Sequence, residues 1–197
     1  MVRPLAVVAV AVAIALALVG SGCSDDGGPG QEATGAEEQP TEPDPRTVSG
    51  GVDAGPADEG IDGVEAFRID SNAHTEDDLA YDPAPPAGGE HNPVPGTCGF
   101  YEVDPPPDEM LVHDLEHGAI WVAYDPGLDD AQLTILRDLV AEQAKVMATP
   151  YRGLDIPLVV SAWGRQLRLD DAGDPRLLAF VEQYRNGANA PEPNAAC

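Results

Sequence analysis

The chain has 197 residues, with 35 acidic against 10 basic side chains and a formal net charge of −25. This charge argues against nucleic-acid binding and against adhesion to anionic lipid surfaces, because both need clustered basic residues. The length suits one folded domain with one core, preceded by a segment of a different kind.

Residues 1–22 have the pattern of a secretory signal peptide. The basic residue Arg3 precedes an apolar run from Leu5 to Val19, and small residues then lead to Cys23. The run is short for a membrane span, which needs about twenty residues. We therefore expect an exported protein, with an uncleaved N-terminal anchor as the alternative.

Cys23 and the residues before it resemble a bacterial lipobox, with Gly20 where that motif usually has an aliphatic residue. The resemblance implies that Cys23 is lipidated and attaches the protein to the extracytoplasmic face of the cell membrane. Cleavage and secretion without a lipid is the alternative. The membrane is thus the one expected partner, and the sequence identifies no protein partner.

Residues 23–59 are rich in Gly, Pro and acidic side chains, and Arg46 is their only basic residue. Such a composition buries too little apolar surface to offset chain entropy, so the segment is predicted to be a disordered acidic tether. Residues 60–197 remain as a single globular domain.

The first half of this domain is rich in proline, which disfavours long helices and central strands. It is predicted to consist of ordered loops with short strands near Ile61–Ile69 and Gly99–Val103. Asp108 then offers an N-cap for a short helix that reaches His117. Gly118 is a favoured residue for ending that helix.

The second half alternates buried strands with helices in the order β-α-β-β-α. Asp129 or Asp130 caps a helix that reaches about Ala148, and a last helix spans about Pro175 to Asn186. The predicted fold class is α+β: a small mixed sheet with two longer helices and a Pro-rich, loop-dominated N-terminal half. The strands are expected over residues 119–124, 157–163 and 166–169.

With Cys23 assigned to the lipid, Cys98 and Cys197 remain. In an exported protein a disulfide between them is the default, and two free thiols are the alternative. The bridge would close a loop of about one hundred residues and contribute up to ~4.7 kcal/mol in the chain-entropy account.

All four histidines lie between positions 74 and 117. His113 and His117 are four residues apart, which places both imidazoles on one helix face. His91 is expected to join them as a metal ligand, with His74 as a fourth. Three histidines and an open position suit zinc, whereas a thioether from Met110 would favour copper.

Glu116 leaves two alternatives to a metal site open. The histidines and Glu116 could form a buried hydrogen-bonded network that only fixes loops, as in an envelope scaffold or interaction module. His113-x-x-Glu116-His117 also matches the inverted zinc-protease string of a metal-dependent hydrolase. That motif needs helix on both sides, whereas Gly118 ends the helix at once, so this is the weakest of the three interpretations.

Residues 85–91 read Pro-Pro-Ala-Gly-Gly-Glu-His, and residues 111–118 read Leu-Val-His-Asp-Leu-Glu-His-Gly. These and two downstream motifs resemble the bacterial domain of unknown function 3105 family and together cover about residues 60–186. The strongest resembles Val-His-x-Leu-Glu-His-Gly. Another resembles Pro-Pro-x-Ser-Gly-x-His, with Ala87-Gly88-Gly89 in place of the usual Ser-Gly. The resemblance implies an exported or membrane-anchored domain with histidines at the four positions above, and it supplies no catalytic residues. The motifs lie at residues 85–91, 111–118, 150–155 and 162–165.

Overall fold

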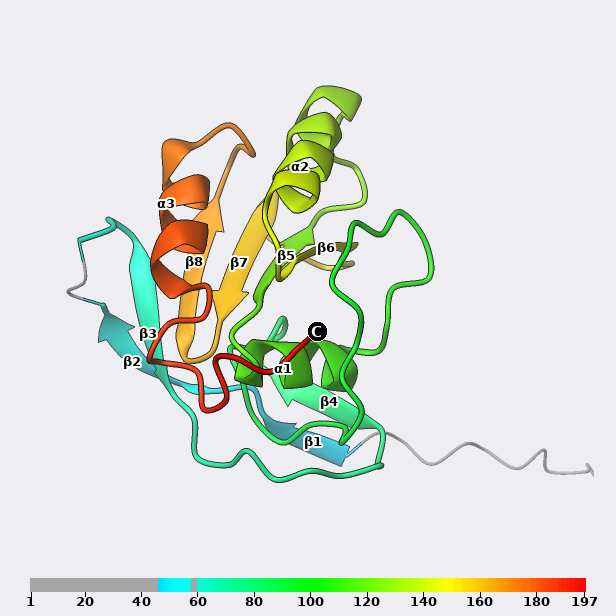
Figure 1. Cartoon of the computed structure of the whole chain (residues 1–197), viewed down its shortest axis with the longest axis vertical. Coiled ribbons are helices and arrows are strands. Elements are labelled where there is room, and N and C mark those ends of the chain that lie inside the picture. The colour runs from blue at the N-terminus through cyan, green and yellow to red at the C-terminus, as the bar shows by residue number, and fades with distance from the viewer. Residues whose placement is uncertain (1–45, 58–59) are drawn as a thin grey trace, which may run out of the picture. The chain divides into compact units, whose positions relative to one another are not determined.

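The computed structural model describes residues 46–57 and 60–197 and confirms an α+β fold (Figure 1). Three helices accompany a six-stranded sheet and a separate two-stranded one in this part of the chain. The elements in chain order are β1 Arg46–Ser49, β2 Val52–Pro56, β3 Val64–Arg68, β4 Leu79–Asp82, α1 Asp108–Glu116, β5 Ile120–Tyr124, α2 Asp130–Glu142, β6 Val146–Pro150, β7 Leu158–Ala162, β8 Arg165–Leu169 and α3 Pro175–Tyr184.

The larger sheet is mixed, with the strand order β2-β3-β8-β7-β5-β6. Its pairs are antiparallel except β5 with β6, which are parallel because α2 carries the chain back between them. The smaller sheet pairs β1 with β4 in parallel. The predicted strands over 119–124, 157–163 and 166–169 correspond to β5, β7 and β8.

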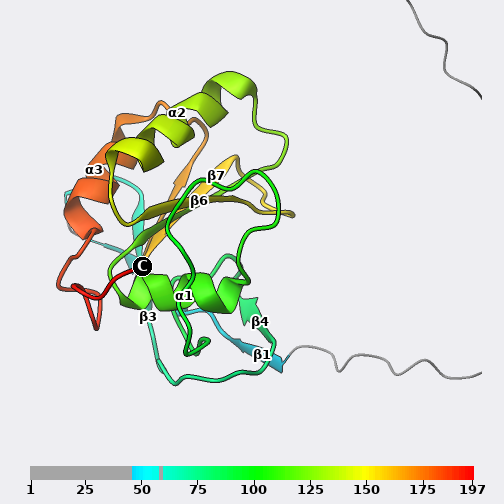
Figure 2. The same ribbon diagram turned by 45° about the vertical axis from the view of Figure 1, so that its right-hand side comes forward.

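Strand β5 divides the core into two parts. Ile120, Val122 and Tyr124 belong to a buried cluster that includes residues of α2 and α3. Trp121 and Ala123 point the other way, into a cluster that includes residues of α1 and β4. Because successive strand residues face opposite sides, the sheet separates α2 and α3 from α1 (Figure 2).

Helix α2 begins where the sequence predicts but ends earlier. The Asp129 side chain accepts a hydrogen bond from the Gln132 amide at 3.0 Å, which confirms Asp129 as the cap. The expected extension to Ala148 is wrong. The helix ends at Glu142 because the next residue, Gln143, is extended with a φ of −115°, and Val146–Pro150 forms the edge strand β6 instead. Val, Thr and Pro are weak helix formers, and pairing with β5 makes this segment a strand.

The N-terminal half contains more strand than the sequence predicts. Strand β3 confirms the expectation near Ile61–Ile69, whereas Gly99–Val103 is not a strand and makes a single bridge from Phe100 to Ala148. The prediction of disorder up to residue 59 is wrong for Arg46–Pro56. These residues form β1 and β2, whose backbone groups are satisfied by β4 and β3 despite the scarcity of apolar side chains.

The predicted signal peptide, the lipidation site Cys23 and the first part of the tether lie outside the described residues. Within the described ranges, no helix is long and apolar enough to cross a membrane.

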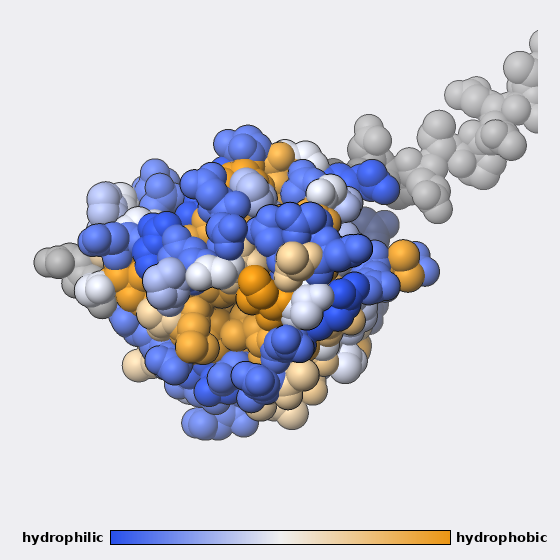
Figure 3. Space-filling view, turned by 90° about the horizontal axis from the view of Figure 1, so that it is seen from above, coloured by the Kyte–Doolittle hydropathy of each residue, from blue (hydrophilic) through white to orange (hydrophobic). Residues whose placement is uncertain are grey.

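A hollow lined by hydrophobic residues and ringed by hydrophilic ones is visible from above the molecule (Figure 3). A pocket of about 390 Å³ lies between α2 and α3, where Leu139 and Leu177 are among its lining side chains. Ile135 and Leu178 contribute to the same pocket and are 40% and 43% exposed.

The expected disulfide joins Cys98 to Cys197, whose Cα atoms lie 5.6 Å apart. It fastens the last residue of the chain to the loop that precedes α1. In Figures 1 and 2 the C-terminus accordingly lies beside α1. A segment without helix or strand is thereby held against the helix that carries two of the histidines.

Candidate metal centre

Helix α1 differs at its start from the prediction and agrees at its end. The N-cap residue is Pro107, and Asp108 is the first helical residue. The Asp108 carboxylate accepts a hydrogen bond from the Tyr151 hydroxyl at 2.9 Å instead of capping the helix. Gly118 has a φ of 81°, a conformation that glycine adopts without strain, and the helix ends before it as expected.

Residues Leu111–Glu116 of α1 are all buried, so protein surrounds the polar face of the helix as well as its apolar face. His113 and His117 lie on one face as their spacing predicts, with their Nε2 atoms 2.9 Å apart. The segments carrying His74 and His91 meet at a β-bridge, where the Thr75 amide donates to the His91 carbonyl at 2.8 Å.

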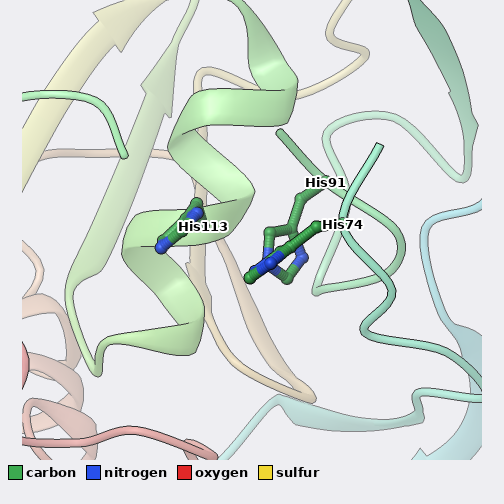
Figure 4. A group of neighbouring side chains, drawn as sticks. All are labelled: His74, His91 and His113. Atoms are coloured by element: carbon green, nitrogen blue, oxygen red, sulfur yellow. The ribbon is translucent and has the colours of Figure 1, made fainter. Parts of the chain in front are cut away.

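The structure brings all four histidines together. The ligand nitrogens of His74, His91 and His113 lie within 4.8 Å of one another, and Figure 4 shows these side chains gathered beside α1. His117 is outside this group of three, and its ring centroid lies 4.4 Å from that of His113. His74 therefore belongs to the central group of three, and His117 occupies the outer position that the sequence suggested for His74.

Backbone carbonyls fix the protonation of three of these rings. The Nδ1 atoms of His91, His113 and His117 donate to the carbonyls of Gly89, Asn92 and Ala196 at 2.8, 2.6 and 2.6 Å, respectively. A carbonyl oxygen can only accept, so the proton is assigned to Nδ1 in each ring. In the neutral form each Nε2 then presents a lone pair to the cluster, as in metal-binding histidines oriented by backbone carbonyls.

Two short contacts consequently pair one acceptor with another. His91 Nε2 lies 3.1 Å from Glu116 Oε2, and His113 Nε2 lies 2.9 Å from His117 Nε2. Each contact calls for an extra proton between the two atoms or for a metal ion that binds to both of them. Burial lowers the pKa of His113, and the charges of the neighbouring histidines lower it further against the effect of its hydrogen bond to Asn92. A metal ion meets this demand without charging a buried imidazole.

Glu116 links the histidines to a loop. Its Oε1 accepts from the Asn72 side-chain amide at 2.7 Å, and its Oε2 also lies 3.6 Å from His74 Nε2. The carboxylate is only 4% exposed. It can balance the charge of a bound cation or serve as a ligand itself.

The cluster opens to solvent at His74, whose side chain is 50% exposed. A pocket of about 250 Å³ is lined by Asn72 and Trp163, which contact Glu116 and His91, respectively, but by none of the histidines. The Trp163 ring lies edge-to-face with His91, 6.0 Å away between centroids. The exposed side of His74 is therefore the point at which the cluster meets solvent.

Asp114 is the polar group of α1 that sequence reasoning missed. It is fully buried, and neither carboxyl oxygen has a hydrogen-bond partner among the residues that the structure describes. Burial raises the pKa of Asp114 to about 7, against smaller opposing effects of the Gly96 backbone and Lys145. The available signal was an aspartate between Leu111-Val112 and Leu115, apolar residues that a short helix would bury.

The other groups that contact the histidine cluster could not be predicted from the sequence. The Ala196 carbonyl is a backbone group, and Asn72 lies in a loop with no motif of its own. The backbone carbonyl of Met110 accepts a hydrogen bond from the Gly96 amide at 3.2 Å. The polar contacts described for the cluster do not include its sulfur.

Comparison with curated proteins finds no match, and neither does comparison with solved structures. A family model described as "Protein of unknown function (DUF3105)" matches residues 73–197, which include all four histidines, α1 and both disulfide cysteines. The chain belongs to the DUF3105 family.

Proposed function

We propose that the domain binds a divalent transition metal through His74, His91 and His113, with His117 as a fourth ligand. The observation that carries the proposal is the set of carbonyls of Gly89, Asn92 and Ala196, which direct three Nε2 lone pairs into one cluster. Rings that served only as hydrogen-bonding spacers would turn at least one N–H toward another ring or toward Glu116.

Zinc and copper are the metals that this donor set suits. Neutral imidazoles bind both, and a group of three histidines with a solvent-facing side leaves a position for water or a small ligand. Because the sulfur of Met110 is not among the donors brought together, nothing favours a thioether-dependent copper site.

The test is metal content and affinity in the purified ectodomain. We expect one equivalent of zinc or copper by elemental analysis after loading and removal of excess metal. His74→Ala should weaken binding by about 100-fold, because loss of a group that merely orients a ligand already costs about 10–100-fold. His74 is half exposed, so this change should leave the fold intact.

A matched control is Asp77→Asn, which removes a negative charge from the same loop at a side chain that is 65% exposed. It should bind metal as tightly as the parent protein. Absence of stoichiometric metal in the parent protein, or equal losses in His74→Ala and Asp77→Asn, would refute the proposed site.

The second function we consider is a structural network that holds loops in an interaction module. It is favoured by Glu116, which touches Asn72, His91 and His74 at once. The two functions differ in their response to metal. A bound metal at 100 times its Kd adds about 2.7 kcal/mol to the free energy of unfolding, and a chelator removes it. Stability that chelation leaves unchanged would favour the network.

We also propose that the protein is exported and attached to the membrane by lipid on Cys23. Support comes from the signal-like residues before Cys23 and from the Cys98–Cys197 disulfide, which suits an oxidising compartment. Metabolic labelling with a fatty acid tests this. The parent protein should carry label in the membrane fraction, and Cys23→Ala should lose it. Equal labelling of both would contradict the assignment.

A further inference from the structure

We infer that the C-terminal segment 186–197, here called the strap, makes metal affinity depend on the redox state of Cys98 and Cys197. The closed disulfide holds His117 in its metal-binding tautomer, and opening it releases that histidine. The inference rests on the proposed metal site and adds a means of regulating it.

The connection between disulfide and histidine is direct. The carbonyl that accepts from His117 Nδ1 at 2.6 Å belongs to Ala196, the residue next to Cys197. Fixing Cys197 to Cys98 therefore also fixes this carbonyl. His91 and His113 differ from His117, because their accepting carbonyls, Gly89 and Asn92, lie in the interior of the chain.

The other contacts of the strap converge on the same end of α1. The Glu192 amide donates to the Glu116 carbonyl at 3.0 Å, and Glu192 Oε2 lies 3.8 Å from His117 Nε2. Lys145 Nζ donates to the carbonyls of His117 and Pro193 at 2.8 and 3.2 Å. The strap thus lies against His117 and against the carbonyl end of the helix that carries it.

Residues 186–193 are held by hydrogen bonds to Gly118, Glu116, Lys145 and Trp163. Residues 194–197 contain no helix or strand and have fewer contacts in the described part of the chain. These are the disulfide, the His117–Ala196 hydrogen bond, and the Ala195 amide that donates to the Glu192 carbonyl at 3.1 Å. A segment with so few contacts depends on its covalent tie for its position. Once the bond opens, Ala196 is free to leave, and His117 Nδ1 loses its acceptor. The ring can then carry its proton on Nε2, and the nitrogen that faces the cluster then has no lone pair for a metal.

The redox step is a thiol–disulfide exchange with a dithiol reductant. A reductant thiolate attacks one sulfur of the Cys98–Cys197 bond and forms a mixed disulfide, which its second thiol resolves. Two electrons and two protons pass to the protein, giving two thiols, while the reductant becomes a disulfide. By linkage, a metal that prefers the closed form also makes the disulfide harder to reduce.

A double-mutant cycle separates this mechanism from general loosening of the fold. Zinc affinity is measured by competition with a chromophoric chelator for the parent domain, Cys98→Ser/Cys197→Ser, His117→Ala and the variant combining all three. We expect opening the disulfide to weaken binding by about 10–100-fold when His117 is present. It should have no further effect in the His117→Ala background. Equal losses in both backgrounds would overturn the inference.

Lys145→Met provides a second perturbation that leaves the disulfide intact. It removes the amine that binds the strap to the His117 carbonyl, so affinity should fall when His117 is present and stay constant in the His117→Ala background. Circular dichroism verifies that each variant is folded. Unchanged affinity in folded Cys98→Ser/Cys197→Ser also counts against the strap.

¹⁵N NMR of the His117 ring keeps the two proposals distinguishable. If the oxidised parent protein binds no metal, the proposed function fails and redox-linked affinity fails with it. The ¹⁵N spectrum still tests whether the strap fixes the tautomer of His117. It stands if the Nδ1-protonated tautomer is present with the disulfide closed and lost in Cys98→Ser/Cys197→Ser, and it falls if the tautomer is the same in both.

Discussion

Replacing Asp114 with asparagine should change how the stability of the domain depends on pH. Asp114 is fully buried, and burial outweighs the opposing effects of the Gly96 backbone and Lys145, so its charged form is disfavoured. The pKa is raised from 3.8 to about 7. Folding therefore takes up a proton at this site between about pH 4 and pH 7, and asparagine removes that uptake.

The magnitude follows from the width of this window. The folded pKa lies about three units above the unfolded value, and each unit corresponds to ~1.4 kcal/mol. Because the folded state binds the proton more tightly, the contribution of Asp114 to the free energy of unfolding falls as the pH rises through the window. Relative to the parent, Asp114→Asn should gain up to about 4 kcal/mol between pH 4 and pH 8, with little further change above pH 8.

Urea unfolding at several pH values, with a chelator present, measures this difference. Contributions that are common to both proteins cancel when one curve is subtracted from the other. The absolute stability of the variant is not the test, because the asparagine amide is itself buried. A difference between the two proteins that stays constant from pH 4 to pH 8 would refute the assignment of a raised pKa to Asp114.

Three further changes test the fold by chemical denaturation. Gly118→Ala should cost about 1–3 kcal/mol, because φ is 81° and a Cβ would lie 3.0 Å from the Asn186 Cα; an unchanged midpoint would contradict that close approach. Leu136→Ala should cost about 2–5 kcal/mol, since Leu136 is fully buried between α2 and the sheet, and a loss below 1 kcal/mol would argue against this packing. Reducing Cys98–Cys197 should cost about 2–5 kcal/mol, and equal stability of the oxidised and reduced domains would count against a structural role for the bond.

Local chemistry allowed several elements to be predicted from the sequence. Asp129 caps α2 because its carboxylate reaches an amide three residues along, and Gly118 ends α1 because glycine adopts a positive φ without strain. The buried strands β5 and β7 follow from continuous apolar runs. Each of these signals acts over a few residues, so the neighbouring residues in the sequence are sufficient to predict it.

Pairing with distant strands decided the elements that were mispredicted. Val146–Pro150 follows a helix-compatible stretch and is a strand because β5 lies beside it. Arg46–Pro56 has few apolar side chains and is ordered because β4 and β3 satisfy its backbone. The paired strand lies far along the chain for β6 and β1, whereas β2 pairs with β3, the next strand; no local apolar pattern identifies these partners.

The candidate site shows the same division. The sequence by itself determined the number of histidines, the pairing of His113 with His117 on one helix face, and the two cysteines available for a disulfide. Tertiary structure decided that His74 joins the central group and that the Ala196 carbonyl orients His117. Spacing along a helix is periodic, so the sequence predicts which residues share a helix face. The position of a loop or of a backbone carbonyl depends on how the whole chain packs.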